Sequence, residues 1–150
     1  MVDVIADAEM DLLRLETEIK NFKADFEAKT SERVFSNHTW ITLRIEEKLL
    51  KKAKRLKEKL ENVKKMYANE FPRSSLQFSA PIEHCDIIIT SINDVAQVYK
   101  MRLGLMDIKM RLNHSLPIIV NNMTHLRNRF YIIKGNVNRG VKLTEEDIFR

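Results

Sequence analysis

The sequence predicts an all-α fold of two to three long helices with coiled-coil heptads, arranged as an elongated bundle or rod. Its 150 residues include only three Gly and three Pro, where average usage would give about 10 Gly and about 7 Pro. Charged residues account for 31% of the chain, and apolar residues recur at spacings of three and four over most of its length. This profile is typical of long helices and disfavours a β-sandwich, a barrel or a glycine-rich phosphate loop.

Residues 1–71 contain neither Gly nor Pro and are predicted to form one long helix or a helix pair. From Ile5 to Phe26 the apolar residues alternate spacings of three and four, which is the pattern of a heptad seam. The pattern weakens over 29–37, where Ser, Thr and Asn side chains can compete for backbone hydrogen bonds or cap a new helix. We favour a single helix with a weak point there, because no helix-breaking residue is present.

A second seam runs from Ile41 to Tyr67 and is surrounded by Lys and Arg. An extra spacing of four near Leu49 is expected to adjust the coil locally. The next segment, 72–81, contains two Pro and three Ser. We predict that it is a linker and the clearest break in the chain.

Residues 82–134 are predicted to form one kinked long helix. A sharp seam runs from Leu105 to Ile133, and Pro117 lies inside it. Because the seam continues past the proline, we expect a kink rather than a helix end. The run 87–90 also fits a short buried strand, but no second strand is available to pair with it.

The segment 135–150 is predicted to be a loop followed by a docking tail. Gly135 is expected to cap the preceding helix. Thr144 is followed by three acidic residues, which is the pattern of a helix start. We expect a short C-terminal helical turn that docks through Ile148 and Phe149.

Charge is distributed unevenly along a chain whose formal net charge is +5. Residues 1–30 carry a net charge of −4, whereas 44–65 carry +6 and 100–140 carry +7. We therefore expect the acidic first helix and the basic last helix to face each other, or to face partners of opposite charge.

The heptad seams predict contacts with other helical chains, because together they offer more apolar surface than one rod-shaped monomer covers. Partner helices would interdigitate with the seam side chains, knobs into holes. The seam residues expected to bind partners are Leu12, Leu15, Ile19, Phe22, Phe26, Ile45, Leu49, Leu56, Leu60, Leu112, Leu116, Ile119, Met123, Leu126 and Phe130.

The basic run 44–65 offers a second functional candidate, the binding of nucleic acid or an anionic membrane surface. A nuclear-import patch is another reading of the same residues. The residues expected to carry anionic-surface binding are Lys51, Lys52, Lys54, Arg55 and Lys57. Four Glu are interspersed and no set of aromatic residues for stacking accompanies the run. A solvated coiled-coil surface is therefore the favoured interpretation.

No catalytic residue, metal site or cofactor is predicted, and no small-molecule substrate is expected. His84, Cys85 and Asp86 are adjacent potential ligands, but adjacent residues of a helix point in different directions. Cys85 is expected to be a buried thiol rather than a nucleophile. We recognise neither a signal peptide nor an apolar run long enough to span a membrane. A cytoplasmic location, including an organelle surface, is expected, with the nucleus as an alternative.

Two stretches resemble small helical subunits of the lysosome-related-organelle biogenesis complex and of the BORC complex, its relative in lysosome positioning. Residues 31–39, Ser-Glu-Arg-Val-Phe-Ser-Asn-His-Thr, and the heptad run 43–60 are similar to the KxDL-motif subunit. Glu46-Glu47-Lys48-Leu49 stands where that family has its motif. Residues 106–126 are similar to a proline-containing helix of another subunit. The order of acidic helix, basic helix, linker and third helix also resembles the small Ska-type kinetochore subunit.

The function expected from these observations is that of a non-enzymatic structural subunit in a multi-subunit helical complex. Its role would be scaffolding or tethering within a hetero-oligomer. The resemblance implies an assembly that positions lysosomes or takes part in organelle trafficking. The alternatives are a kinetochore- or cytoskeleton-associated coiled-coil subunit, and a protein that binds nucleic acid or anionic surfaces through 44–65.

Overall fold

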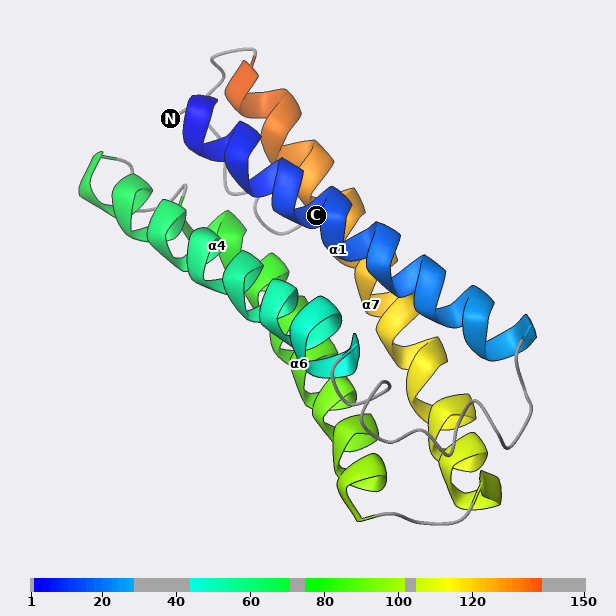
Figure 1. Ribbon diagram of the computed structural model, residues 1–150. Coiled ribbons are helices and arrows are strands. Elements are labelled where there is room, and N and C mark those ends of the chain that lie inside the picture. The colour runs from blue at the N-terminus through cyan, green and yellow to red at the C-terminus, as the bar shows by residue number, and fades with distance from the viewer. Residues whose placement is uncertain (1, 29–43, 71–74, 102–104, 139–150) are drawn as a thin grey trace.

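The computed structural model describes residues 2–28, 44–70, 75–101 and 105–138, and these are essentially all helical (Figure 1). No strand occurs among them, so the predicted all-α class is confirmed for this part of the chain. The elements are α1 (Val2–Ala28), a π-helical segment η1 (Arg44–Leu50), α4 (Lys51–Glu70), a 3₁₀ turn η2 (Leu76–Phe78), α6 (Ser79–Lys100) and α7 (Leu105–Asn138).

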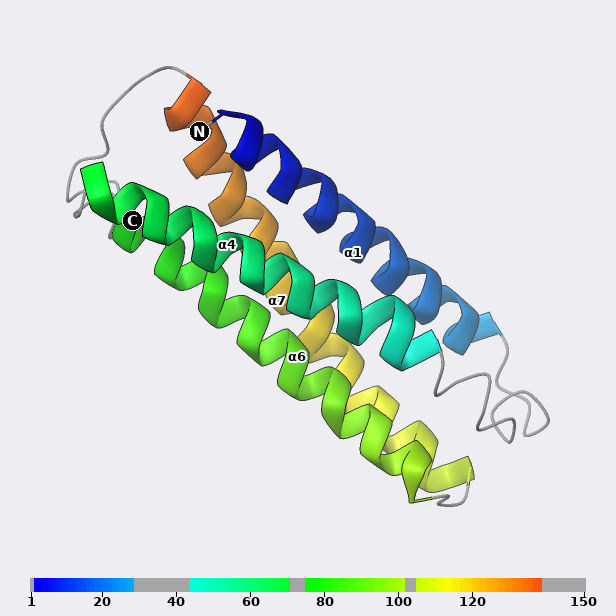
Figure 2. The ribbon, with the colours of Figure 1, turned by 60° about the vertical axis from the view of Figure 1, so that its left-hand side comes forward.

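The four long helices form an up-down-up-down bundle in which successive helices are antiparallel (Figures 1 and 2). Helix α1 packs against α4 and α7, and α6 packs against the same two helices. Each helix turns its apolar stripe toward the shared centre, and the buried side chains form a single hydrophobic core. The helices therefore lie side by side rather than end to end. None of the described helices is both long and apolar enough to cross a membrane.

The preference for a single helix over residues 1–71 is wrong, and the structure contains the alternative helix pair. Helix α1 ends at Ala28, and α4 returns beside it in the opposite direction. The predicted weak point at 29–37 lies outside the described residues. The reversal brings the apolar stripes of both helices into one core, and such burial supplies most of the stability of helices in proteins.

Residues 82–134 likewise form two helices instead of the one that we predicted. Helix α6 ends at Lys100, and α7 begins at Leu105 and runs back along α6. The sequence signal at this break is Gly104, since glycine costs about 1 kcal/mol relative to alanine inside a helix. The run 87–90, for which a short strand was the disfavoured alternative, is part of α6.

Two expectations for the last helix have different outcomes. Helix α7 continues through Pro117, as predicted from the unbroken seam. It also continues past Gly135 to Asn138, so the expectation that Gly135 caps the helix is wrong. Most of the predicted tail, 139–150, lies outside the described residues.

The predicted linker 72–81 extends too far toward the C-terminus. Regular structure resumes at η2, and α6 begins at Ser79. Pro81 therefore lies in the first turn of α6. Proline is tolerated there because a first-turn N–H has no partner within the helix.

The π-helical segment η1 explains the irregular spacing noted near Leu49. Ile45, Leu49 and Ala53 are four residues apart and all are buried. A π-helix pairs residue i with i+5 and so holds more residues in each turn than an α-helix. Residues spaced by four therefore stay on the side of the helix that faces the core, from η1 into the start of α4.

Candidate protein-interaction surface

The structure places the predicted partner-binding residues in the chain's own core. Those whose side chains are described are buried, and the most accessible of them, Leu116, is 5% exposed. The side chain of Phe26 lies outside the described residues. Because the helices of one chain cover these stripes, a partner helix would reach them only if the bundle opened. Their role in partner binding remains a prediction.

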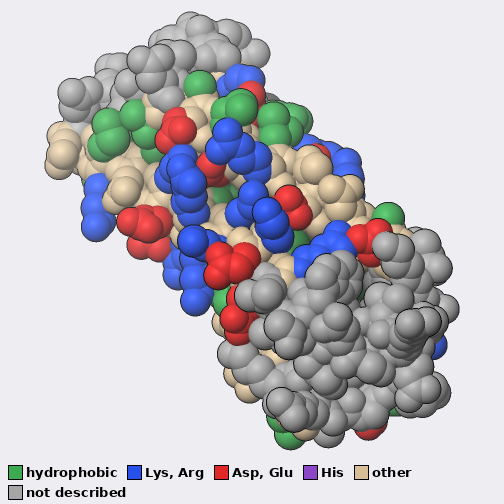
Figure 3. Space-filling model, in the orientation of Figure 1, with side chains coloured by type: hydrophobic (Ala, Val, Ile, Leu, Met, Phe, Trp, Pro, Cys, Tyr) green, Lys and Arg blue, Asp and Glu red, His purple; other side chains and the backbone are tan. Residues whose placement is uncertain are grey.

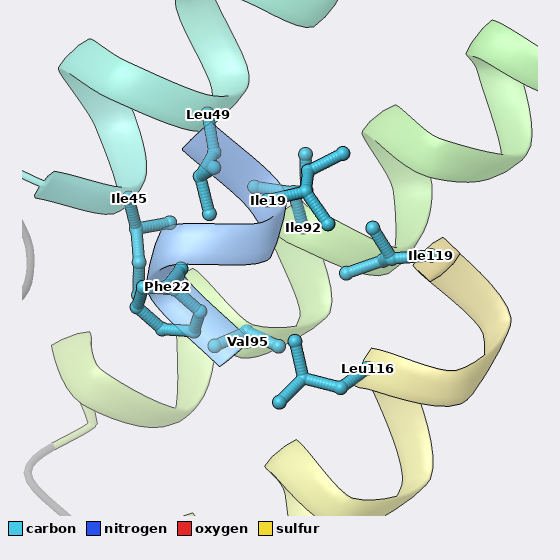
Figure 4. Close-up of a pocket in the computed structure, with 8 residues that line it drawn as sticks. All are labelled: Ile19, Phe22, Ile45, Leu49, Ile92, Val95, Leu116 and Ile119. Atoms are coloured by element: carbon cyan, nitrogen blue, oxygen red, sulfur yellow. The ribbon is translucent and has the colours of Figure 1, made fainter. Parts of the chain in front are cut away.

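A small cavity lies inside this core, between α1, η1, α6 and α7 (Figure 4). Its volume is about 10 Å³, which is close to the space needed for a single water molecule. Its lining is entirely apolar, so it offers a water molecule no hydrogen-bond partner. The cavity is thus too small for a ligand and too apolar for water. Its lining residues are Ile19, Phe22, Ile45, Leu49, Ile92, Val95, Leu116 and Ile119.

Ion pairs fix α1 against α4. Asp11 is buried, and its carboxylate lies 2.8 Å from the Lys59 ammonium and 3.3 Å from the Arg55 guanidinium. Lys59 also lies 2.7 Å from Asp7 and lowers the pKa of that carboxyl by a hydrogen bond. Burial opposes the charge of Lys59, but its contacts with Asp11 and Asp7 outweigh this effect and raise the pKa of the ammonium. Charge thus fixes how these two helices lie against each other.

A second set of ion pairs joins α1 to α7. Glu16 lies 3.0 Å from Arg127, and Glu9 lies 2.5 Å from Lys134. The expectation that the acidic first helix faces the basic last helix is therefore confirmed. The carboxylates of α1 point to both neighbouring helices, so this helix neutralises positive charge on each side.

The basic run on α4 is largely engaged within the bundle. Lys51 pairs with Glu47 at 3.5 Å, and Lys57 pairs with Asp86 of α6 at 2.5 Å. Arg55 contacts Asp11, as described above, whereas Lys52 and Lys54 form no ion pair with any described residue. Lys and Arg side chains alternate with Asp and Glu over this face of the molecule (Figure 3). The run therefore presents less unpaired positive charge than its sequence suggests.

The outer side of α7 has a different composition. Between Leu112 and Ile133, no exposed residue is Lys, Arg, Asp or Glu. These exposed residues lie opposite the buried stripe of the helix, and we call them the asparagine-rich face. They are Asn113, His114, Pro117, Asn121, His125, Asn128, Tyr131 and Ile132.

An open groove of about 430 Å³ borders this face on the side of α1. Apolar side chains of α7, including Leu116 and Val120, form part of its lining, together with Asn113, Asn121 and Thr124. Pro117 also lines the groove, and its missing N–H leaves the Asn113 carbonyl without the hydrogen bond that residue 117 would donate. Lys23 of α1 completes the lining, so the groove combines apolar surface with polar side chains and one cation.

Sequence reasoning missed a polar cluster between α6 and α7. Asn122 donates from Nδ2 to the Ile118 carbonyl at 2.9 Å, which fixes the orientation of its amide. Its Oδ1 accordingly accepts from His84 Nδ1 at 2.9 Å. The ring of His125 stacks on that of His84, with centroids 5.4 Å apart. No group of three or more metal-ligating side chains occurs among the described residues. These histidines thus take part in the contact between the two helices.

Cys85 is buried in the core, as predicted. Desolvation by burial, reinforced by the charge of Asp86, raises the pKa of its thiol to about 12. A thiol in this state is neutral at physiological pH, and the thiolate is the reactive form. The local environment therefore opposes a nucleophilic role for Cys85.

Comparisons of the chain with protein-family models, curated proteins and solved structures found no match. The surfaces that the described residues form are therefore the guide to function. Among these surfaces, the asparagine-rich face and the groove beside it differ most from an ordinary solvated helix surface.

Proposed function

We propose that this protein is a non-enzymatic helical subunit that binds other helical chains through the asparagine-rich face of α7. The observation that carries the proposal is the lack of Lys, Arg, Asp and Glu at the exposed positions between Leu112 and Ile133. Charged residues are depleted at the centres of protein interfaces, whereas aromatic residues are enriched there. A face without these charges, in a chain with 31% charged residues, fits an interface better than a solvated surface.

The side chains of this face supply both kinds of contact that a helical partner needs. Tyr131 and Ile132 are 46% and 48% exposed and offer apolar anchors at one end. The three Asn amides each provide a donor and an acceptor without a net charge to desolvate. The groove beside Pro117 offers apolar surface into which an amphipathic helix can pack.

The resemblance of 31–60 and 106–126 to subunits of organelle-positioning complexes indicates which assembly to test first. We propose a BORC-type complex at the cytoplasmic surface of an organelle. Residues 31–43 lie outside the described part of the chain, so this step rests on the sequence resemblance alone. Binding of an anionic surface through α4 is the alternative, and the ion pairs of Lys51, Arg55 and Lys57 weigh against it.

The test compares two variants that introduce the same charge on different helices. Asn121→Arg places a cation in the asparagine-rich face, and Asn62→Arg places one on the exposed side of α4, where charges are already frequent. Both tagged variants and the unchanged chain would be expressed in source cells, purified and analysed by quantitative mass spectrometry. Circular dichroism would verify that each variant is folded.

We expect the partners of the unchanged chain to be retained by Asn62→Arg and depleted about tenfold or more by Asn121→Arg, because an unpaired charge at an interface costs several kcal/mol. Equal recovery of the same partners by both variants would contradict the proposal. Loss of partners after Lys52→Glu and Lys54→Glu, with none after Asn121→Arg, would support the anionic-surface alternative instead.

A further inference from the structure

Two histidines from neighbouring helices lie against each other between α6 and α7. His84 of α6 and His125 of α7 have their ring centroids 5.4 Å apart, and the ring planes differ by 16°. Imidazole nitrogens bind Zn²⁺ at about 2.0–2.1 Å, so two rings on one tetrahedral ion have centroids about 5 Å apart. The observed separation is therefore close to the one that a shared metal ion requires.

We infer that His84 and His125 bind one divalent transition-metal ion of the Zn²⁺ class and thereby link α6 to α7. Imidazole nitrogen is a preferred ligand of Zn²⁺, Cu²⁺ and Ni²⁺. The ion needs both helices in place, so it binds the folded chain and stabilises it. The inference is independent of the partner proposed for the asparagine-rich face, since both ligands belong to the same chain.

Asn122 prepares His84 for this role by fixing its tautomer. Because Asn122 Nδ2 donates to the Ile118 carbonyl, its Oδ1 accepts a hydrogen bond from His84 Nδ1 at 2.9 Å. The proton of the neutral ring then lies on Nδ1, and Nε2 keeps its lone pair for a metal ion. Metal-binding histidines commonly have this arrangement, in which one ring nitrogen donates to a protein oxygen and the other binds the ion. Asn122 is therefore a positioning residue for the site.

The site is open to solvent on the side of α7. His84 is half-buried, whereas His125 is exposed, so the His125 ring can turn until one of its nitrogens and His84 Nε2 reach the same ion. The described residues form no group of three His, Cys, Asp or Glu around a metal position. Water would therefore complete the coordination, which suits a reversible site better than a structural zinc site closed by protein ligands.

Charged and thiol groups close to these histidines in the sequence are engaged elsewhere. The Cys85 thiol is buried in the core, and Asp86 pairs with Lys57 of α4. Arg127 extends toward α1, where it pairs with Glu16. The Arg127 charge, which would repel a metal cation, is thus directed to a different neighbouring helix than His125.

The first experiment titrates the purified full chain with Zn²⁺ by isothermal titration calorimetry, after bound metal has been removed with a chelator. We expect the unchanged chain and His114→Ala to bind one Zn²⁺, and His84→Gln and His125→Ala to bind it at least about tenfold more weakly. His114 is the matched control because it is another exposed histidine of α7. Glutamine at position 84 keeps a donor for Asn122 but lacks the imidazole nitrogen.

Circular dichroism would verify that each variant is folded. Equal Zn²⁺ affinity in the unchanged chain, His84→Gln and His125→Ala would overturn the inference. So would the failure of the unchanged chain to bind Zn²⁺ in excess.

The second experiment observes the imidazole nitrogens directly by long-range ¹H–¹⁵N magnetic resonance. Added Zn²⁺ should shift the ring resonances of His84 and His125 together and leave those of His114 unchanged. Mg²⁺, which prefers oxygen ligands, should shift none of them. Shifts confined to His114, or equal shifts with Mg²⁺, would overturn the site.

A third variant tests the positioning role of Asn122. Asn122→Ala releases His84 Nδ1 and should weaken Zn²⁺ binding about 10–100-fold while one ion is still bound per chain. Unchanged Zn²⁺ affinity in Asn122→Ala would overturn this role.

Discussion

Glu16 and Arg127 are separated by 111 positions in the sequence, yet their side chains meet at 3.0 Å and close the bundle between its first and last helices. The pair has a counterpart nearer the ends of the same helices, where Glu9 contacts Lys134. On the opposite side of α1, Asp11 binds cations of α4. Complementary charge therefore specifies which helices are neighbours, while the apolar stripes supply the core.

Replacing Asp11 with Ala should destabilise the fold by about 1–3 kcal/mol, because it leaves the partly buried Lys59 ammonium with one carboxylate fewer. The free energy of unfolding would be measured by urea denaturation. Glu58→Ala on the exposed side of α4 is the matched control and should change it by no more than about 0.5 kcal/mol. Equal losses in both variants would show that the contacts of Asp11 with α4 contribute no specific stability.

Stability should fall at both extremes of pH for reasons that involve the same contact. The pKa of Asp7 is lowered below 3.8 in the folded state, so its contribution is present above that pH and is lost as acid protonates the carboxylate. The pKa of Lys59 is raised above 10.5, so its contribution is present below that pH and is lost as base neutralises the ammonium. Urea denaturation at a series of pH values would measure the loss of stability in acid and in base. Asp7→Asn should reduce the loss in acid, and an unchanged loss in acid would contradict this role of Asp7.

Cys85 should resist alkylation in the folded protein. Its thiol is buried, and its pKa is raised from 9.0 to about 12, so almost none is thiolate at pH 8. The same shift makes stability decline as the pH rises above 9, because only the unfolded state then releases the proton. Iodoacetamide labelling followed by mass spectrometry should show modification in urea but not in buffer. An added exposed thiol, Asn62→Cys, should react promptly in both.

Gln77→Met should stabilise the protein. Gln77 is 8% exposed, and neither polar atom of its side chain has a hydrogen-bond partner among the described residues. Removing an unsatisfied buried amide should gain about 1–3 kcal/mol, since methionine has a similar length and no such groups to desolvate. Thermal unfolding would measure the gain. Gln97→Met on the exposed side of α6 is the control, and a comparable gain there would indicate a general effect of the substitution.

The sequence was sufficient to predict the helical class and most of the buried positions. Spacings of three and four between apolar residues report the helix period directly, and Ile5, Leu56 and Leu126 are buried as that period requires. The reversal between α1 and α4 was predicted only as the less favoured alternative, and the reversal between α6 and α7 was not predicted, because a chain turns back where tertiary burial favours it. Gly104 was the single local signal near the second reversal.

The surfaces were harder to predict than the core. Ion pairs such as Glu9 with Lys134 depend on which helices are neighbours, and helix periodicity alone does not determine that. The candidate cations of α4 looked available in the sequence because their partners, Asp11 and Asp86, come from other helices. The asparagine-rich face did leave a signal, because uncharged residues occupy the outward positions of this stretch of α7. The predicted binding residues were instead those of the apolar seams and of the basic run 44–65.

The acidic character of α1 has a practical consequence for work with fragments of this protein. Residues 1–30 carry −4, so their removal from a chain of +5 leaves +9. The cations that α1 neutralises would then face solvent, and such a fragment should adhere to nucleic acids and other polyanions. An affinity for RNA or DNA found only after truncation would therefore result from the removal of α1 and would not be a property of the full chain. In the full chain, the acidic residues of α1 should therefore lower the affinity for polyanions.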